Sequence, residues 1–172
     1  TNDWFYDDVA FVYGEGLFAG TSSTAFSPNA SMTRAMLVTV LYRLEGKPTV
    51  RGRSGFSDVV VNSYYEDAVT WAADNGIVNG TGTTTFSPDT NVTREQLAAI
   101  IKRYAEYKGV TIYEPTSALA PTANVSAWAK DNVAWAAAEG ILSATQAANA
   151  VKSATRAEVA MAMYTYLTKT AK

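Results

Sequence analysis

Residues 86–97 read FSPDTNVTREQL, and residues 26–37 read FSPNASMTRAML. In both segments a Phe-Ser-Pro turn leads through a short polar stretch to Thr-Arg, where an apolar periodic run begins. The segments lie sixty positions apart, and the flanking sequence repeats at the same spacing without a gap. The chain therefore contains an internal repeat. Further pairs at this spacing are Asp7 with Asp67, Gly16 with Gly76, Gly20 with Gly80, and Arg43 with Arg103.

A third, more divergent copy follows. Trp128 and Trp135 correspond to Tyr64 and Trp71, and Thr155-Arg156 corresponds to Thr93-Arg94. The loop between these landmarks is shorter in the third copy and lacks both glycine and Phe-Ser-Pro. We interpret the chain as one domain of three repeats. They span residues 1–48, 56–110 and 119–172.

Each repeat is predicted to form a helix, a loop and a second helix. The second helix carries apolar residues at i, i+3, i+4 and i+7, which places one apolar face on each. Thr33, Thr93 and Thr155 are suited to cap its start, and only the last two are followed by the Gln or Glu of a capping box. The apolar positions are Leu37, Val40, Leu41 and Leu44, then Leu97, Ile100, Ile101 and Tyr104, then Val159, Ala162, Met163 and Tyr166.

The first helix of each repeat is shorter. Aromatic residues recur seven positions apart, as in Tyr64 with Trp71 and Trp128 with Trp135. This spacing predicts that both rings lie on one helix face. Gly16, Gly76 and Gly140 are expected just beyond its end, where a left-handed residue is favoured.

A helical unit of this size cannot bury its own apolar face, whereas three units can close around a shared axis. We therefore expect an all-α fold in which three helix-loop-helix repeats form a pseudo-threefold arrangement around a central helical bundle. An open solenoid is the alternative. It would need polar caps at both ends, and neither end of the chain shows one.

The amino-acid composition excludes several classes of protein. The 172 residues are 48% hydrophobic and 17% charged, which is typical of a folded globular protein. Lysine plus arginine number 14 against 16 acidic residues, so the net charge of -2 gives no basic excess for nucleic acid. No apolar run is long enough to predict membrane insertion, and the first residues do not open a signal peptide, so we expect any targeting segment to lie outside this sequence.

The chain has no cysteine and no histidine. Thiol nucleophiles, imidazole bases and nearly all zinc sites are thereby excluded, and we expect no metal and no cofactor. Carboxylate catalysis remains open through Asp7-Asp8, Glu66-Asp67 or Asp58. Asp7 and Asp67 recur at equivalent repeat positions, whereas a catalytic site would break the repeat at one place. We therefore predict a binding protein without a catalytic residue.

The repeat resembles the S-layer homology module, which occurs as a triplet in bacterial cell-surface proteins. The resemblance rests on Phe-Ser-Pro, on the glycine pair before it and on the helix start Thr-Arg-Ala-Glu, which this chain holds at residues 155–158. Residues 56–59 also resemble the module's Phe-x-Asp-Val opening, which copy one lacks. The resemblance covers essentially the whole chain.

The resemblance implies a three-pronged spindle that binds secondary cell-wall polysaccharide in grooves between modules. The ligand it implies is commonly a pyruvate-ketal amino sugar. We accordingly expect an extracellular protein, noncovalently anchored to the bacterial cell wall, with S-layer lattice neighbours as further partners. A protein-interaction or lattice-forming module without saccharide affinity is the alternative.

Arg34, Arg94 and Arg156 are the candidate ligand-binding cations. Each stands in the first turn of a helix, where unpaired backbone N–H groups and the helix dipole favour an anion. A planar guanidinium can also pair a carboxylate through two hydrogen bonds. The alternative is that the three arginines join the copies through salt bridges. Arg43 and Arg103, nine residues further on, are predicted to be structural.

Glycines and indoles complete the candidate site. Gly20 and Gly80 would let a sugar approach bare backbone, and Trp71 or Trp135 could stack on a pyranose ring. The glycines could instead serve turn geometry alone, and the tryptophans could belong to the core.

Overall fold

The computed structural model describes residues 5–18, 25–113, 115 and 124–170. Within these ranges the regular structure is helical, and the only β-pairing consists of isolated bridges, so the all-α prediction is confirmed. No helix in the described ranges is both long and apolar enough to cross a membrane. The helices are α1 (Tyr6–Gly14), α2 (Arg34–Leu44), α3 (Glu66–Asp74), α4 (Arg94–Tyr107), α5 (Lys130–Ala138), α6 (Ala144–Ala147) and α7 (Arg156–Thr165), with a 3₁₀ turn at Ala127–Ala129 and a π-helical turn at Tyr166–Thr170.

The helix starts follow the sequence. Thr33, Thr93 and Thr155 each cap a helix by accepting a hydrogen bond from the amide three residues on. The reciprocal bond of a capping box forms in α4 and α7, and α2 has Met36 where the box needs an acceptor. These caps fix where the second helix of each copy begins.

Glycine ends the first helix of each copy. Gly16, Gly76 and Gly140 have φ of 69°, 69° and 75°, which is the left-handed region. The next residue then turns back, as when the Ile77 amide donates to the Ala72 carbonyl at 2.8 Å. The predicted helix ends are confirmed.

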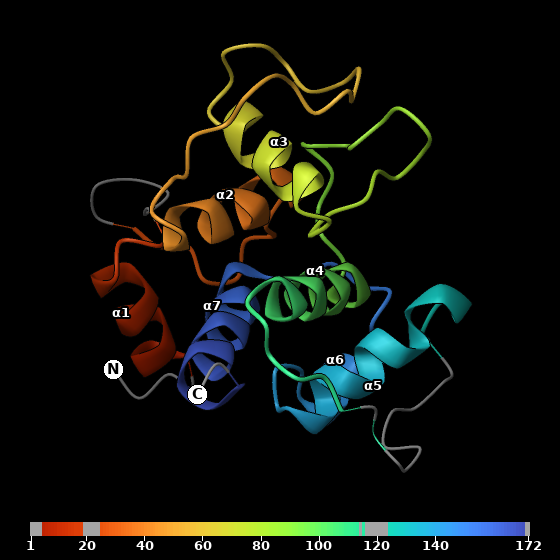
Figure 1. Ribbon diagram of the computed structural model, residues 1–172. Helices are drawn as coiled ribbons and strands as arrows, with labels where there is room; N and C mark the ends of the chain where they lie inside the picture. The colour runs from red at the N-terminus through yellow and green to blue at the C-terminus, as the bar shows by residue number, and fades with distance from the viewer. Residues whose placement is uncertain (1–4, 19–24, 114, 116–123, 171–172) are drawn as a thin grey trace.

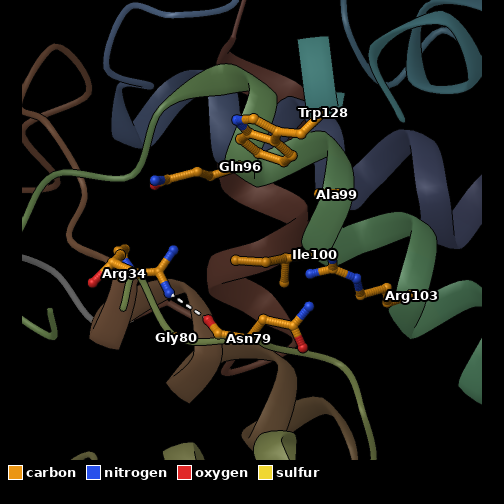
Figure 2. A pocket seen from close by; sticks show the side chains of 9 residues that line it. Arg34, Asn79, Gly80, Gln96, Ala99, Ile100, Arg103 and Trp128 are labelled. Carbon is orange, nitrogen blue, oxygen red and sulfur yellow. Dashed lines mark hydrogen bonds between the residues drawn. The ribbon is translucent and has the colours of Figure 1, made fainter. Parts of the chain in front are cut away.

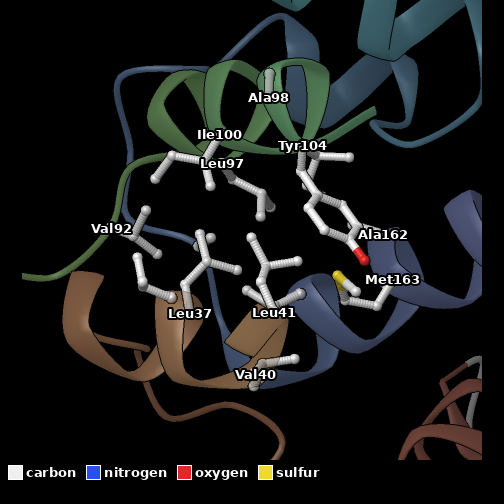
Figure 3. Packing of buried hydrophobic residues seen from close by; sticks show 14 of the residues in the cluster. Leu37, Val40, Leu41, Val92, Leu97, Ala98, Ile100, Tyr104, Ala162 and Met163 are labelled. Carbon is white, nitrogen blue, oxygen red and sulfur yellow. The ribbon is translucent and has the colours of Figure 1, made fainter. Parts of the chain in front are cut away.

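The helices pair between copies. In Figure 1, α1 lies against α7, α2 against α3, and α4 against α5. Each pair therefore joins the first helix of one copy to the second helix of another. The apolar faces of α2, α4 and α7 meet in one core, which includes Leu37, Leu41, Leu97, Tyr104 and Met163 (Figure 3).

Three equivalent residues close a cycle of backbone hydrogen bonds between the copies. The amide of Val92 donates to Met32 at 2.8 Å, that of Ala154 to Val92 at 2.8 Å, and that of Met32 to Ala154 at 3.2 Å. These residues stand directly before the capping threonines. All three are at most 1% exposed, so the cycle lies inside the molecule.

The third copy departs from helix-loop-helix. Its loop contains α6, which starts with a capping box between Ser143 and Gln146. Alanine has the highest helix propensity, and glycine one of the lowest. A loop that replaces glycine by alanine therefore forms a helical turn.

The shared core predicts that the three copies unfold together. Leu97 is fully buried between helices of different copies, so Leu97→Ala should lower the free energy of unfolding by about 2–5 kcal/mol. Denaturant unfolding followed by far-UV circular dichroism and by tryptophan fluorescence should give one coincident transition, before and after the substitution. Two separated transitions would show that the copies fold independently.

Candidate functional site

The helix starts form the junctions between copies. The amide of Arg34 donates to the Thr90 carbonyl at 3.0 Å, and that of Ala35 to the Pro88 carbonyl at 3.0 Å. The third amide donates to the capping threonine. The expectation of unpaired N–H groups for an anion is therefore wrong, because all three amides are occupied. The equivalent bonds run from Arg94 to Lys152, from Glu95 to Ala150, from Arg156 to Ala30, and from Ala157 to Pro28.

The side chain of Arg34 crosses to the loop of copy two. Its Nε donates to the Phe86 carbonyl at 2.8 Å, and one terminal nitrogen donates to the Asn79 carbonyl at 3.0 Å. The guanidinium lies over the Phe86 ring, 4.6 Å from its centroid. Arg34 is only 4% exposed, so it joins two copies and also forms part of a wall between them.

Arg156 repeats this arrangement on the loop of copy one. Its Nε donates to the Phe26 carbonyl at 2.8 Å, and its guanidinium lies 4.6 Å from the Phe26 ring centroid. Phe18 flanks it at 5.7 Å. Burial lowers the pKa of Arg156, as it does for Arg34.

Arg94 differs from the other two. It forms a two-pronged ion pair with Glu158, at 2.6 and 3.0 Å, and donates to the Asn149 carbonyl at 3.2 Å. Both partners are mostly buried, with side chains 15% and 11% exposed. This arginine is neutralised within the chain.

An aspartate holds the copy-two loop against Arg34. Asp58 accepts the amides of Phe86 at 2.8 Å and Ser87 at 2.7 Å, and Phe56 packs on Phe86 with centroids 5.6 Å apart. Burial raises the pKa of Asp58, but these amides and the charge of Arg34 outweigh it and lower the pKa overall. The carboxylate thus stays ionised and keeps the loop in place.

A groove of about 330 Å³ lies between the copies, and we name it the α4 groove (Figure 2). Its lining comes from Arg34 of copy one, from α4 and the loop of copy two, and from Trp128 of copy three. It is thus built from all three copies. The lining residues are Arg34, Asn79, Gly80, Thr81, Gln96, Ala99, Ile100, Arg103 and Trp128.

Two cations face this groove. Figure 2 shows the guanidinium groups of Arg34 and Arg103 pointing toward the same space. Burial lowers the pKa of Arg34, and the like charge of Arg103 lowers it further, while Asp58 acts in the opposite direction. Among the described residues, no carboxylate forms an ion pair with either one. An anion placed between them would relieve their mutual repulsion.

The structure places Trp71 and Trp135 in the core. They are 4% and 1% exposed, and Trp71 packs between Tyr42 and Tyr107. Trp135 borders a second cavity, which is also lined by residues that follow α4 and by the π-helical turn. Their role as sugar platforms stays a prediction.

The aromatic pairs do not share one helix face, so that expectation is wrong. Tyr64 precedes α3 and is 62% exposed, and Trp128 lies in the 3₁₀ turn before α5 and is 54% exposed. Seven-residue spacing places two residues on one face only if both are helical. As a result the exposed indole of Trp128 is the one that reaches the α4 groove.

Gly80 lies in the groove wall and is confined on its other side. A Cβ there would come within 2.5 Å of the Thr85 carbonyl oxygen, 2.6 Å of the Gly82 carbonyl oxygen and 2.9 Å of Phe56. Its φ is not left-handed, so the glycine is required by close packing. Gly20 lies outside the described residues.

Sequence reasoning missed four groove residues: Asn79, Gln96, Arg103 and Trp128. Arg103 was visible as a repeated cation, but its distance in sequence from Arg94 suggested a structural role. The structure places it in the lining of the same groove as Arg34, the arginine of another copy. A repeat shows which residues are equivalent, and it does not show which copies meet.

A family model described as S-layer homology domain matches residues 1–35 and 55–98. The chain belongs to the S-layer homology family through these two segments. Members of this family are cell-surface anchoring modules. The third copy is recognised by its likeness to the other two.

Similar proteins include an amylopullulanase of Thermoanaerobacterium thermosulfurigenes, 31% identical over 98% of this chain and 9% of the relative. The exoglucanase XynX of Acetivibrio thermocellus is 30% identical over 98% of this chain and 16% of its own length. The surface-layer 125 kDa protein of Lysinibacillus sphaericus is 31% identical over 60% of this chain and 9% of its length. The chain therefore spans less than a fifth of each of these proteins, and the enzymes among them match it over only that small part.

The two loop glycines provide a matched pair for testing the groove wall. Gly80→Ala should destabilise the protein by about 1–3 kcal/mol, because its Cβ meets backbone oxygens that cannot move without rebuilding the loop. Gly82→Ala meets only the Thr85 hydroxyl, a side chain that can rotate away, so its cost should be smaller. Thermal unfolding of both variants measures the difference, and equal melting temperatures would contradict the assigned packing role.

Proposed function

We propose that this chain anchors the protein that carries it noncovalently to the bacterial cell wall by binding secondary cell-wall polysaccharide. The ligand is an anionic sugar, a pyruvate-ketal amino sugar, and it binds in the α4 groove. The single observation that carries the proposal is the pair of guanidinium groups, Arg34 and Arg103, which face one groove and form no ion pair with any carboxylate in the described part of the chain.

The charges suit a carboxylate. A pyruvate ketal presents one carboxylate on a rigid ring, and a guanidinium can donate to it through charge-assisted hydrogen bonds. Arg34 is held in place by two backbone carbonyls and the Phe86 ring, so little side-chain entropy is lost when ligand binds. Arg156 has the same fixed geometry on copy one and is the second candidate.

The remaining lining suits a saccharide. Trp128 offers an exposed indole on which a pyranose ring can stack. Asn79 and Gln96 carry amide groups that can both donate to and accept from sugar hydroxyls. Gly80 leaves backbone uncovered in the wall. Charge, ring platform and amides therefore meet in one groove.

We also propose that the chain is not itself catalytic. Two of the carboxylates considered for catalysis have structural partners: Asp58 holds the loop amides, and Glu66 accepts the Asn62 amide and pairs with Arg53. Asp7 and Asp67 lie in the first turns of α1 and α3, where their negative charges interact favourably with the helix dipole. Within the proposal, catalysis belongs to whatever domains the anchor carries.

A lattice-forming or protein-interaction module is the second candidate. Several large apolar residues lie exposed, among them Val60, Val61 and Tyr64, which follow one another near α3. Such residues can mark a protein contact. Sedimentation with purified wall polysaccharide separates the two functions, because the anchor cosediments and a pure lattice module stays in solution.

Arg103→Gln tests the proposed groove. Loss of one charge-assisted contact should weaken binding of wall polysaccharide by about 1.5–3 kcal/mol, roughly 10–100-fold in Kd. Arg103 is half-buried and forms no ion pair with any residue that the structure describes, so the melting temperature should change little. Isothermal titration calorimetry measures the affinity.

Arg51→Gln is the matched control, since Arg51 is exposed in the linker between copies one and two. It removes the same charge from the chain without touching the groove, and its Kd should equal that of the parent. An unchanged Kd in the folded Arg103 variant would remove this residue from the site.

A further inference from the structure

In two of the three copies, the third residue of the second helix lies near the arginine of another copy. Glu158 holds this position in α7 and pairs with Arg94. Gln96 holds it in α4 and lines the same groove as Arg34 (Figure 2). Met36 holds it in α2. The three copies therefore present an acid, an amide and a thioether at one equivalent position.

The residue at the Arg103 position also differs between the copies, and it differs together with the third residue. The position of Arg103 in α4 is occupied by Arg43 in α2 and by Thr165 in α7. Where the third residue is neutral, the helix thus carries a second arginine, and where it is acidic, the helix carries none. In α7, an acid at the third position is thus combined with a neutral residue, Thr165, at the Arg103 position.

Glu158 is fixed by more than its ion pair. Its carboxylate also accepts the Thr155 amide at 3.3 Å, while its own amide donates to the Thr155 hydroxyl at 3.2 Å. A ligand carboxylate that displaced it from Arg94 would leave a mostly buried acid unpaired. The internal carboxylate is already oriented, so an external one competes at a disadvantage.

We infer that Glu158 closes the Arg94 position to anionic saccharides. The residue at the third position of each second helix then determines which arginine can receive the ligand's carboxylate: an acid closes the position, and a neutral residue leaves it open. This inference rests on the proposed function and restricts it. The α4 groove binds ligand, and Arg94 serves to join copies two and three.

The reciprocal exchange Gln96→Glu and Glu158→Gln tests this rule with substitutions that already exist in the chain. Both residues form capping boxes in their own helices, so each variant retains its helix start. The probe is a methyl glycoside of N-acetylglucosamine carrying a pyruvate ketal. Calorimetry gives the Kd, and NMR signals of the arginine Nε–H groups show which arginine responds.

Gln96→Glu should raise the Kd of the probe at least about tenfold, because the new carboxylate occupies Arg34. In the parent, titration should shift the Arg34 signal and leave that of Arg94 in place. In Glu158→Gln, titration should shift the Arg94 signal as well. Circular dichroism of each variant establishes that it is folded.

Two results would overturn the inference while leaving the proposed function intact. One is a parent protein in which the probe shifts Arg94 as strongly as Arg34. The other is a folded Glu158→Gln variant in which Arg34 responds and Arg94 does not. Failure of all three proteins to bind the probe would reject the proposed function, and the inference with it.

Discussion

The structure depends on helix starts that are completed by another copy. Every second helix donates its first two amides to the loop of a neighbouring copy, and the buried cycle of Met32, Val92 and Ala154 connects all three. A buried amide without a partner is costly, so a copy alone would leave these donors unsatisfied. The same bonds place the arginine of one copy on the loop of the next. Fold and groove therefore arise from one set of contacts.

Much of the fold could be predicted from local chemistry. Threonine caps, left-handed glycines and the apolar face of each second helix are determined by residues close in sequence, and the structure has them at the expected positions. The alanine-rich loop of copy three was harder, because a short capped turn such as α6 gives no periodic signal. The exposed position of Trp128 could not be predicted from its spacing to Trp135, since a 3₁₀ turn separates the two.

The candidate site could be predicted only in part, because it depends on contacts between copies that are far apart in sequence. The sequence predicts Arg34 as a ligand residue, but on the basis of free helix amides, and the structure shows that these amides are occupied. Its groove partner Arg103 belongs to another copy, and a repeat does not reveal which copies face one another. Arg34 and Arg94 are equivalent in sequence, yet one faces a second cation and the other an acid. That difference is set by single residues on the neighbouring helix.

In the proposed function, the residues around each arginine determine whether it can bind the ligand's carboxylate. The most direct test of the proposed function is calorimetry of the protein with wall polysaccharide before and after chemical removal of the ketal pyruvate. If the ketal carboxylate binds between Arg34 and Arg103, its removal should weaken binding at least about tenfold. Equal affinity for both polymers would contradict it and would leave stacking and hydroxyl contacts as the basis of recognition.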